Sequence, residues 1–244
     1  MREAGYLNYL THEEIKKHIK TGFMTKELDA IAYNFISSHN AIPSFLNYEG
    51  FPASICVSIN DVVVHGIPGN QKIKNGDIVS IDVGVELHGY HSDAARTYIV
   101  GDVEPEVHDL VVNTEKSLYE GLSKIKEGAK IGDIGAAIED FAHKHGLSVV
   151  HELVGHGVGT NIHEDPDVPN YGKAGTGLTL KAGMVLAVEP MLNLGERYIY
   201  LHDDDDWTIS TDDELPSAHF EHTVVVTKDG CKILTGDISD GEEI

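Results

Sequence analysis

Hydrophobic residues recur at two different spacings along the chain, and this separates expected helices from expected strands. Apolar side chains three and four positions apart predict helical structure over residues 1–40, 106–126 and 131–145. Shorter runs rich in β-branched residues predict strands over residues 54–59 and 62–64. Helices therefore come first, strands follow, and helices then return.

A further strand alternates strictly and carries a carboxylate on the face opposite its apolar residues. Over residues 78–85 every second residue is valine or isoleucine, and Asp82 lies on the other face. A second strand-like run covers residues 94–100, with a turn midway at residues 87–89. Pairing the strands about that turn places Asp82 opposite Asp93, with Cβ atoms roughly 5 Å apart. Carboxylates this close repel each other, so the hairpin predicts a bound divalent cation.

The order of helices and strands occurs twice, and particular residues recur with it. At an offset of 106, residues 19–22 match residues 125–128, Phe35 matches Phe141, and His39 matches His145. Such internal similarity is the signature of a duplicated unit. We therefore expect residues 1–244 to form a single domain with pseudo-symmetric halves of about 1–103 and 104–244.

The duplication also superposes polar residues on the predicted metal site. At an offset of 107 Glu189 falls on Asp82, while strand order places Glu221 on Asp93 and His156 on His65. The candidate ligands are Asp82, Asp93, His156, Glu189 and Glu221. Ligands that are mostly oxygen, with a single nitrogen, suit Mn²⁺, Fe²⁺, Co²⁺ or Zn²⁺.

Charge decides how many ions such a site holds. One divalent ion would leave about two of the four carboxylate charges unpaired in a partly dry site, which is unfavourable. Two ions neutralise the set and share a bridging water acidified toward neutrality. The chemistry this arrangement favours is hydrolysis of an ester, amide or phosphoester.

Composition excludes several other classes of protein. The formal net charge of −22 disfavours nucleic acid as a partner. We expect the acidic runs at residues 202–207, 211–214 and 237–244 to be solvated loops. Cys56 and Cys231 provide no disulfide framework, and the sequence shows neither a signal peptide nor an apolar stretch long enough to span a membrane. The expected location is the cytoplasm.

Several short motifs together resemble the methionine aminopeptidases of type I, over nearly the whole chain and in the same order. These motifs are Val64-His65-Gly66-Ile67-Pro68, Asp77-Ile-Val-Ser-Ile-Asp82, His91-Ser92-Asp93, Gly155-His156-Gly157-Val158-Gly159, His163-Glu164, Ala187-Val188-Glu189-Pro190-Met191 and Phe220-Glu221-His222-Thr223. The resemblance implies an α+β "pita bread" fold with pseudo-twofold symmetry, an antiparallel sheet and helices on its outer face.

The resemblance also implies a role for each residue of the site. The five candidate ligands would hold two divalent ions (Co, Mn, Fe, Zn or Ni), with Asp93 and Glu221 bridging them. The bridging hydroxide would be the nucleophile and Glu189 the general base. His163 would hydrogen-bond the scissile carbonyl, and His65 would lie over the peptide bond near the second residue of the substrate.

The methionine side chain would occupy a pocket formed by Tyr48, Phe51, Cys56 and Trp207. Phe45 and Ile162 stand where relatives often carry a cysteine and an aromatic residue. Asn60, Val62 and Ser217 resemble a site for Na⁺ or K⁺. The implied substrates are N-termini of peptides and nascent proteins, met at the ribosome, with a small second residue. No nucleic-acid or membrane contact is expected, and the chain is expected to be a monomer.

Two other readings remain open from the sequence. A proline-specific relative, a prolidase or Xaa-Pro aminopeptidase, would have the same five ligands, although such enzymes usually carry a large additional N-terminal domain. A non-enzymatic binding protein on the same fold would tend to have lost ligands, and here all five are present.

Overall fold

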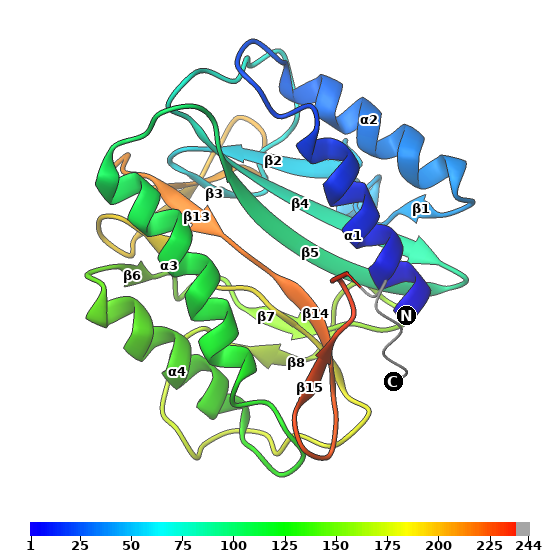
Figure 1. Ribbon diagram of the computed structural model, residues 1–244, viewed down its shortest axis with the longest axis vertical. Coiled ribbons are helices and arrows are strands. Elements are labelled where there is room, and N and C mark those ends of the chain that lie inside the picture. Colours follow the sequence, from blue (N-terminus) through cyan, green and yellow to red (C-terminus); the bar gives the residue numbers. More distant parts are fainter. Residues whose placement is uncertain (238–244) are drawn as a thin grey trace.

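Four helices lie on the outer side of the strands in the computed structural model, which describes residues 1–237 (Figure 1). They are α1 (Arg2–Lys16), α2 (Thr25–Ser38), α3 (Pro105–Leu122) and α4 (Ile131–Lys144). The expectation of helix throughout residues 1–40 is wrong at its centre. Residues 17–24 separate α1 from α2, and Gly22 among them has φ +89°, a left-handed backbone that lies outside the α-helical region. None of the helices within residues 1–237 is long and apolar enough to cross a membrane.

The first half of the chain builds an antiparallel sheet around its longest strands. These are β4 (Ile78–Leu87) and β5 (Tyr90–Ile99), while β1 (Ile42–Pro43) and β2 (Ile55–Ile59) pair with the other edge of β4. A short 3₁₀ turn, Tyr48–Gly50, lies between β1 and β2. The predicted strands are therefore present, and the expected alternation along β4 buries Val79, Ile81, Val83 and Val85 in one core with residues of α1 and α2.

The second half builds a five-stranded antiparallel sheet and two smaller ones. In the large sheet β15 (Cys231–Ile233), β14 (His222–Val226), β9 (Val185–Val188), β7 (Gly155–Gly157) and β8 (Glu164–Val168) are neighbours in that order. One small sheet joins β13 (Ser217–His219), β10 (Met191–Asn193) and β6 (Ser148–Val149). The other joins β11 (Ile199–Leu201), β12 (Ile209–Thr211) and β3 (Val62–Val64) of the first half.

The register of the β4–β5 hairpin corrects one expectation. Its turn contains only His88 and Gly89, both with positive φ, and each residue of β4 pairs with a residue of β5 two positions later than expected. Asp93 therefore pairs with Gly84 rather than with Asp82, and Asp82 pairs with Ala95. The shift moves the pairing by two residues, an even number, so the two aspartates stay on one face as diagonal neighbours.

The duplication predicted from the sequence reappears as matching backbone geometry in the two halves. The N–H of Met24 donates to Oε2 of Glu27 at the start of α2, and the N–H of Lys130 donates to Oδ2 of Asp133 at the start of α4, both at 2.8 Å. At the ends of these helices, Nδ1 of His39 and of His145 each lies 2.8 Å from the carbonyl oxygen four residues earlier. Glycines 22 and 128, at the same offset, have φ angles of +89° and +87°.

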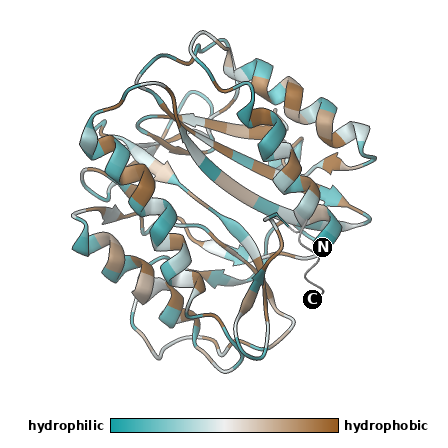
Figure 2. Ribbon diagram, viewed as in Figure 1, coloured by the Kyte–Doolittle hydropathy of each residue, from teal (hydrophilic) through white to brown (hydrophobic). Residues whose placement is uncertain are grey.

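The two halves meet along β5, which runs beside β13 and β14 in the middle of Figure 1. Thr223 Oγ1 donates to the carbonyl of Asp93 at 2.7 Å and accepts from its N–H at 2.9 Å, while Thr97 Oγ1 donates to the carbonyl of His219 at 2.8 Å. Each half has its own apolar core beneath its helices. Figure 2 shows hydrophobic residues interleaved with hydrophilic ones along each helix, as expected when one face is buried.

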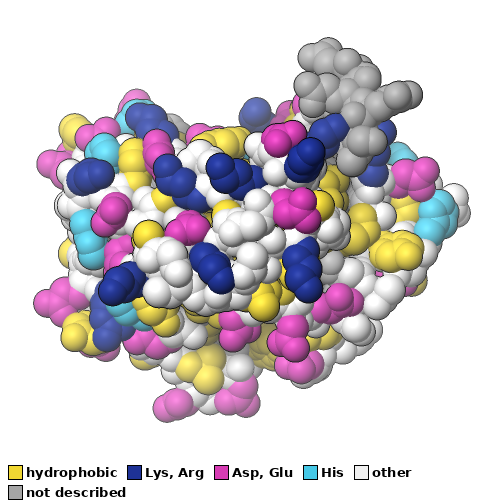
Figure 3. Space-filling model, turned by 90° about the horizontal axis from the view of Figure 1, so that it is seen from below, with side chains coloured by type: hydrophobic (Ala, Val, Ile, Leu, Met, Phe, Trp, Pro, Cys, Tyr) yellow, Lys and Arg dark blue, Asp and Glu magenta, His cyan; other side chains and the backbone are white. Residues whose placement is uncertain are grey.

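The strong negative charge is not spread as a uniform acidic shell. On the face drawn in Figure 3, Lys and Arg side chains are interspersed with Asp and Glu. The acidic run at residues 202–207 is exposed at Asp203, Asp204 and Asp206, as expected for a solvated loop. Residues 238–244 of the acidic tail lie outside the described part of the chain.

Candidate metal centre

The five candidate ligands come from both halves and line one cavity of about 670 Å³. Asp82 lies on β4 and Asp93 on β5, while His156 is the central residue of β7. Glu189 directly follows β9 and Glu221 directly precedes β14. Asp82 and Asp93 project from the face of the β4–β5 hairpin opposite α1, because the alternate residues of these strands pack against α1.

In the second half the two glutamates lie opposite each other. Val188 pairs with His222 and Met191 pairs with His219, so the register between these pairs places Glu189 across from Glu221. The N–H of Phe220 donates to the carbonyl of Pro190 within this stretch. The glutamates are therefore directly opposed, whereas the aspartates of the first half are diagonal.

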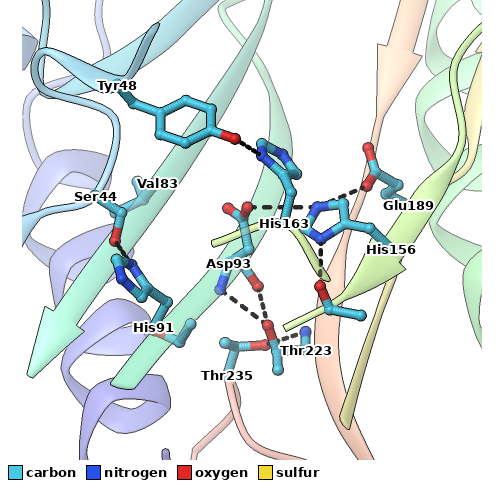
Figure 4. A network of polar contacts seen from close by, with 12 residues as sticks. Ser44, Tyr48, Val83, His91, Asp93, His156, His163, Glu189, Thr223 and Thr235 are labelled. Carbon is cyan, nitrogen blue, oxygen red and sulfur yellow. Dashed lines mark hydrogen bonds and ion pairs between the residues drawn. The ribbon is translucent and has the colours of Figure 1, made fainter. Parts of the chain in front are cut away.

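The ligand atoms converge within the span of a metal site. Oxygens of Asp82, Asp93 and Glu221 lie within 4.8 Å of one another, and so do ligand atoms of His156, Glu189 and Glu221. Nε2 of His156 lies 3.4 Å from Oε1 of Glu189 and 3.8 Å from Oδ2 of Asp93, contacts drawn in Figure 4. Nδ1 of the same ring lies 2.9 Å from the carbonyl of Gly157, which leaves Nε2 directed at the carboxylates.

The carboxylates are buried and lack sufficient partners within the described chain. Oδ1 of Asp82, Oδ1 of Asp93 and Oε1 of Glu221 are buried atoms with no hydrogen bond there. Burial raises the pKa of Asp82 to about 7 and that of Glu189 to about 7. Burial, and then the charges of neighbouring carboxylates, raise the pKa values of Asp93 and Glu221 well above their usual range.

These residues fit divalent metal ions. Burying carboxylate oxygens that lack hydrogen-bond partners raises the free energy of the folded protein, and bound cations offset this by pairing with the negative charge. Four carboxylates and one imidazole form the donor set that hard or borderline divalent ions prefer. Two overlapping groups of candidate ligands share Glu221.

His65 and His156, equivalent by sequence, occupy different surroundings. His65 has φ +58° and directs its ring toward Trp207, with a centroid separation of 6.2 Å in an edge arrangement. Burial lowers its pKa to about 4, which keeps the ring neutral. His65 belongs to none of the candidate ligand groups of residues 1–237, whereas His156 belongs to two. Its position is compatible with contact to a substrate beside the metal centre.

His163 lies at the edge of the same centre. Its ring centroid is 4.2 Å from that of His156, and one of its ring nitrogens lies within 4.8 Å of ligand atoms of Asp93 and His156. Nδ1 of His163 is 2.9 Å from the hydroxyl of Tyr48 (Figure 4). His163 was expected to lie near the substrate, and its contact with Tyr48 was not predicted from the sequence.

The expected pocket residues do come together beside the metal centre. Phe51 and Trp207 pack edge to face at 5.2 Å, and Tyr48 and Cys56 belong to the same apolar cluster. That cluster also contains Phe45 and Ile162, the two positions where the resemblance implies a cysteine and an aromatic residue. Cys56 pairs directly with Asp82 across β2 and β4. Burial and then the nearby Asp82 raise the pKa of its thiol, which therefore remains a neutral apolar lining.

One aspartate of the acidic run at residues 202–207 has a structural role that the sequence analysis missed. Asp205 accepts hydrogen bonds from the N–H groups of Trp207 at 2.9 Å and Thr208 at 2.8 Å. These bonds hold the pocket tryptophan at the end of the loop. A carboxylate two residues before an aromatic residue in a tight turn was the available signal.

The residues of the expected monovalent-cation site are also near one another. The carbonyl of Asn60 accepts from the N–H of Ser217 at 2.9 Å, and Val62 begins β3 two residues later. The side chain of Asn60 is engaged elsewhere, donating to Asp77 at 2.9 Å. Binding of Na⁺ or K⁺ here stays a prediction.

Two further residues support the centre without having been predicted. His219 is buried, and its Nε2 has no hydrogen bond within the described chain and lies 3.6 Å from Oε2 of Glu189. Asn170 donates to the carbonyl of Glu189 at 3.0 Å. His219 could have been found, because it lies two positions before Glu221 and therefore on the same face of an extended chain.

Known proteins match this chain over nearly all of its length. Residues 1–228 match the family description of metallopeptidase family M24, and the chain belongs to that family. Methionine aminopeptidase 1 of Bacillus subtilis (strain 168) is 53% identical over 235 residues, covering 96% of this chain and 94% of that protein.

Solved structures agree. Methionine aminopeptidase from Rickettsia prowazekii has a TM-score of 0.95 at 50% identity, covering 96% of this chain and 95% of that one. Methionine aminopeptidase from Thermotoga maritima has a TM-score of 0.95 at 39% identity, covering 97% and 95%. The resemblance read from the motifs is confirmed, together with the α+β pita-bread fold.

Proposed function

We propose that this chain is a metal-dependent aminopeptidase that removes N-terminal methionine from peptides and nascent proteins in the cytoplasm. The observation that carries the proposal is a single cavity that joins five convergent ligands to an apolar pocket containing Phe51 and Trp207. We further propose that residues 1–244 act as one catalytic domain and as a monomer. The free thiols of Cys56 and Cys231 accord with a reducing compartment.

The proposed ligands are Asp82, Asp93, His156, Glu189 and Glu221, with Asp93 and Glu221 shared between two ions. When bound, the ions would supply a water whose pKa is lowered toward neutrality, so that it can attack a carbonyl carbon. Glu189 is placed to accept a proton from that water, because its carboxylate lies at the edge of the ligand set. Asn170 donates to the backbone carbonyl of Glu189 at 3.0 Å, and Nε2 of His219 lies 3.6 Å from its carboxylate.

Two histidines act on the substrate in this proposal. His163 donates a hydrogen bond to the scissile carbonyl and to the negative charge that develops on it. His65, packed against Trp207, bounds the space beside the peptide bond and favours a small second residue. Both rings are neutral at physiological pH, since burial lowers the pKa of each.

The pocket selects the side chain to be removed. Tyr48, Phe51, Cys56 and Trp207 provide an aromatic and thiol lining that suits a flexible, polarizable thioether. A β-branched or charged side chain would either clash with the rings or lose its hydration without a partner.

A comparison of two tripeptides tests this function. We expect Met-Ala-Ser to be hydrolysed with added Co²⁺ or Mn²⁺, with release of free methionine, and Ala-Pro-Ala to be left intact. Cleavage of Ala-Pro-Ala alone would indicate a proline-specific enzyme. Cleavage of neither, by protein shown by elemental analysis to carry metal, would indicate a binding protein.

A further inference from the structure

The hydroxyl of Tyr48 and Nδ1 of His163 make a direct contact between the side-chain pocket and the metal centre. The two atoms are 2.9 Å apart, although the residues are 115 positions apart in the chain (Figure 4). The rings also pack against each other, with centroids 5.2 Å apart and planes inclined by 49°. Tyr48 therefore touches the histidine proposed to act on the substrate carbonyl, besides lining the pocket.

The backbone fixes Tyr48 in place. Its N–H donates to the carbonyl of Phe45 at 2.9 Å, and its carbonyl accepts from the N–H of Phe51 at 2.8 Å. The residues on either side, Asn47 and Glu49, have φ angles of +66° and +49°. Left-handed conformations at two non-glycine residues cost free energy and persist only where the surroundings determine them. The turn thus presents the Tyr48 hydroxyl from a rigid base.

The chemistry of a neutral imidazole limits what this contact can do. One ring nitrogen carries the proton and donates, and the other accepts. A histidine that donates to a carbonyl through Nε2 must have an unprotonated Nδ1. A phenol hydroxyl that donates to Nδ1 stabilises that tautomer and also restricts rotation of the ring.

We propose that Tyr48 is a positioning residue for His163, donating its O–H to Nδ1 so that the ring proton stays on Nε2. The inference rests on the proposed function, in which the Nε2–H of His163 donates to the substrate carbonyl. The phenol ring still lines the pocket, so one side chain serves both substrate binding and carbonyl activation. The two roles are separable, since only the second needs the hydroxyl.

Ring tautomers can be measured directly. We expect ¹⁵N NMR of the metal-free protein, with the signal assigned by its loss in His163→Ala, to show the proton of His163 on Nε2. In Tyr48→Phe the proton should redistribute between the two nitrogens. A wild-type ring protonated on Nδ1, or a distribution unaffected by Tyr48→Phe, would overturn the proposal.

Kinetics provide an independent test. Tyr48→Phe keeps the ring and should lower kcat by about 2- to 10-fold, the range for one neutral hydrogen bond, with KM nearly unchanged. Tyr33→Phe removes the hydroxyl of an exposed tyrosine on α2 and should change neither constant. A rise in KM at unchanged kcat in Tyr48→Phe would assign the hydroxyl to the pocket and reject the positioning role.

A double-mutant cycle separates this inference from the proposed function. His163→Ala should lower kcat/KM by roughly 10²–10³ if the ring donates to the developing oxyanion. Tyr48→Phe should then cause no further loss in the His163→Ala background, and little in His163→Asn, whose amide donates without a tautomer. Near-normal activity of His163→Ala would refute the proposed role of His163. If His163→Ala shows the expected loss of kcat/KM but Tyr48→Phe lowers it further by the same factor as in the wild type, only the inference about Tyr48 is refuted.

Discussion

The two halves of the molecule share a scaffold but differ at the positions that form the site. Both begin with a helix pair whose second member is capped by an acidic side chain, at Glu27 in one half and Asp133 in the other. In the first half β4 and β5 are joined by a two-residue turn and hold Asp82 and Asp93 diagonally. The two halves therefore share a framework and differ in the arrangement of the residues at the candidate site.

The second half differs in both spacing and side-chain length. Its equivalent strands, β9 and β14, are separated by 33 residues rather than by a short turn. That insertion carries Trp207, and with it one wall of the pocket. The candidate ligands Glu189 and Glu221 are directly opposed, and their side chains are one methylene longer than those of Asp82 and Asp93.

The largest expected effect comes from exchanging the equivalent ligands Glu189 and Asp82 for amides. Glu189→Gln should lower kcat by about 10²–10⁴ with metal still bound, because the proposed proton acceptor is lost. Asp82→Asn should mainly weaken metal binding, so that excess metal restores much of the rate. Steady-state kinetics at several metal concentrations, with elemental analysis, measure both. Equal losses at saturating metal would remove the proposed difference between the halves.

The second prediction concerns the equivalent histidines. His156→Ala should reduce metal affinity by more than the roughly 10- to 100-fold typical of residues behind the ligands, because a ligand itself is removed. His65→Ala should retain metal and lose kcat/KM, most clearly for substrates with a small second residue. Isothermal titration calorimetry with Mn²⁺ measures the metal affinity of each variant. Loss of metal from His65→Ala would show that both copies ligate.

The third prediction uses the raised pKa of Glu221. In the metal-free protein this carboxyl binds protons more tightly when folded than when unfolded, so stability is lost as pH rises above the unfolded pKa. Glu221→Gln removes that loss. Its advantage in Tm over wild type should therefore widen from pH 5 to pH 8, by about 2–4 °C for each kcal/mol.

Exposed Glu120 on α3 provides the control for that measurement. Glu120→Gln should show a Tm difference from wild type that does not vary with pH. Metal should raise the Tm of wild type more at pH 8 than at pH 5, because the ionised ligand set binds it. A Glu221→Gln advantage that is constant with pH would contradict the account.

The smallest effect is expected at the two matched helix caps. Glu27→Ala and Asp133→Ala should each lower the free energy of unfolding by about 0.5–2 kcal/mol. Asp133→Ala should cost more, because Asp133 also accepts from the N–H of Gly175 at 2.7 Å. Denaturant unfolding of both variants measures the difference. A larger cost for Glu27→Ala would mean that the second bond contributes nothing.

Much of this fold could be predicted because its signals are local. Alternation along residues 78–85 indicated a strand buried on one face, and the repeat at an offset of 106 indicated two similar halves. The register could not be predicted as securely. It depended on which residues form the turn, and only the left-handed conformations of His88 and Gly89 decide that.

The candidate site was predictable in part for the same reason. Ligand positions follow the strands that carry them, so Asp82, Asp93 and Glu221 could be proposed from alternation and symmetry. His219 was missed, because a buried histidine near a ligand looks the same in sequence as one that only fills a core. Asp205 was assigned to a solvated loop because sequence does not show which carboxylate in a run meets backbone N–H groups.

The sequence by itself determined the elements, the duplication and the residue types of the centre, since these depend on periodicity and spacing along one chain. Tertiary structure alone decided which side chains meet across long separations. The contact between Tyr48 and His163 and the different surroundings of His65 and His156 are of this kind. Contacts between distant segments depend on the packing and strand register of the whole fold, and a local sequence pattern does not determine these.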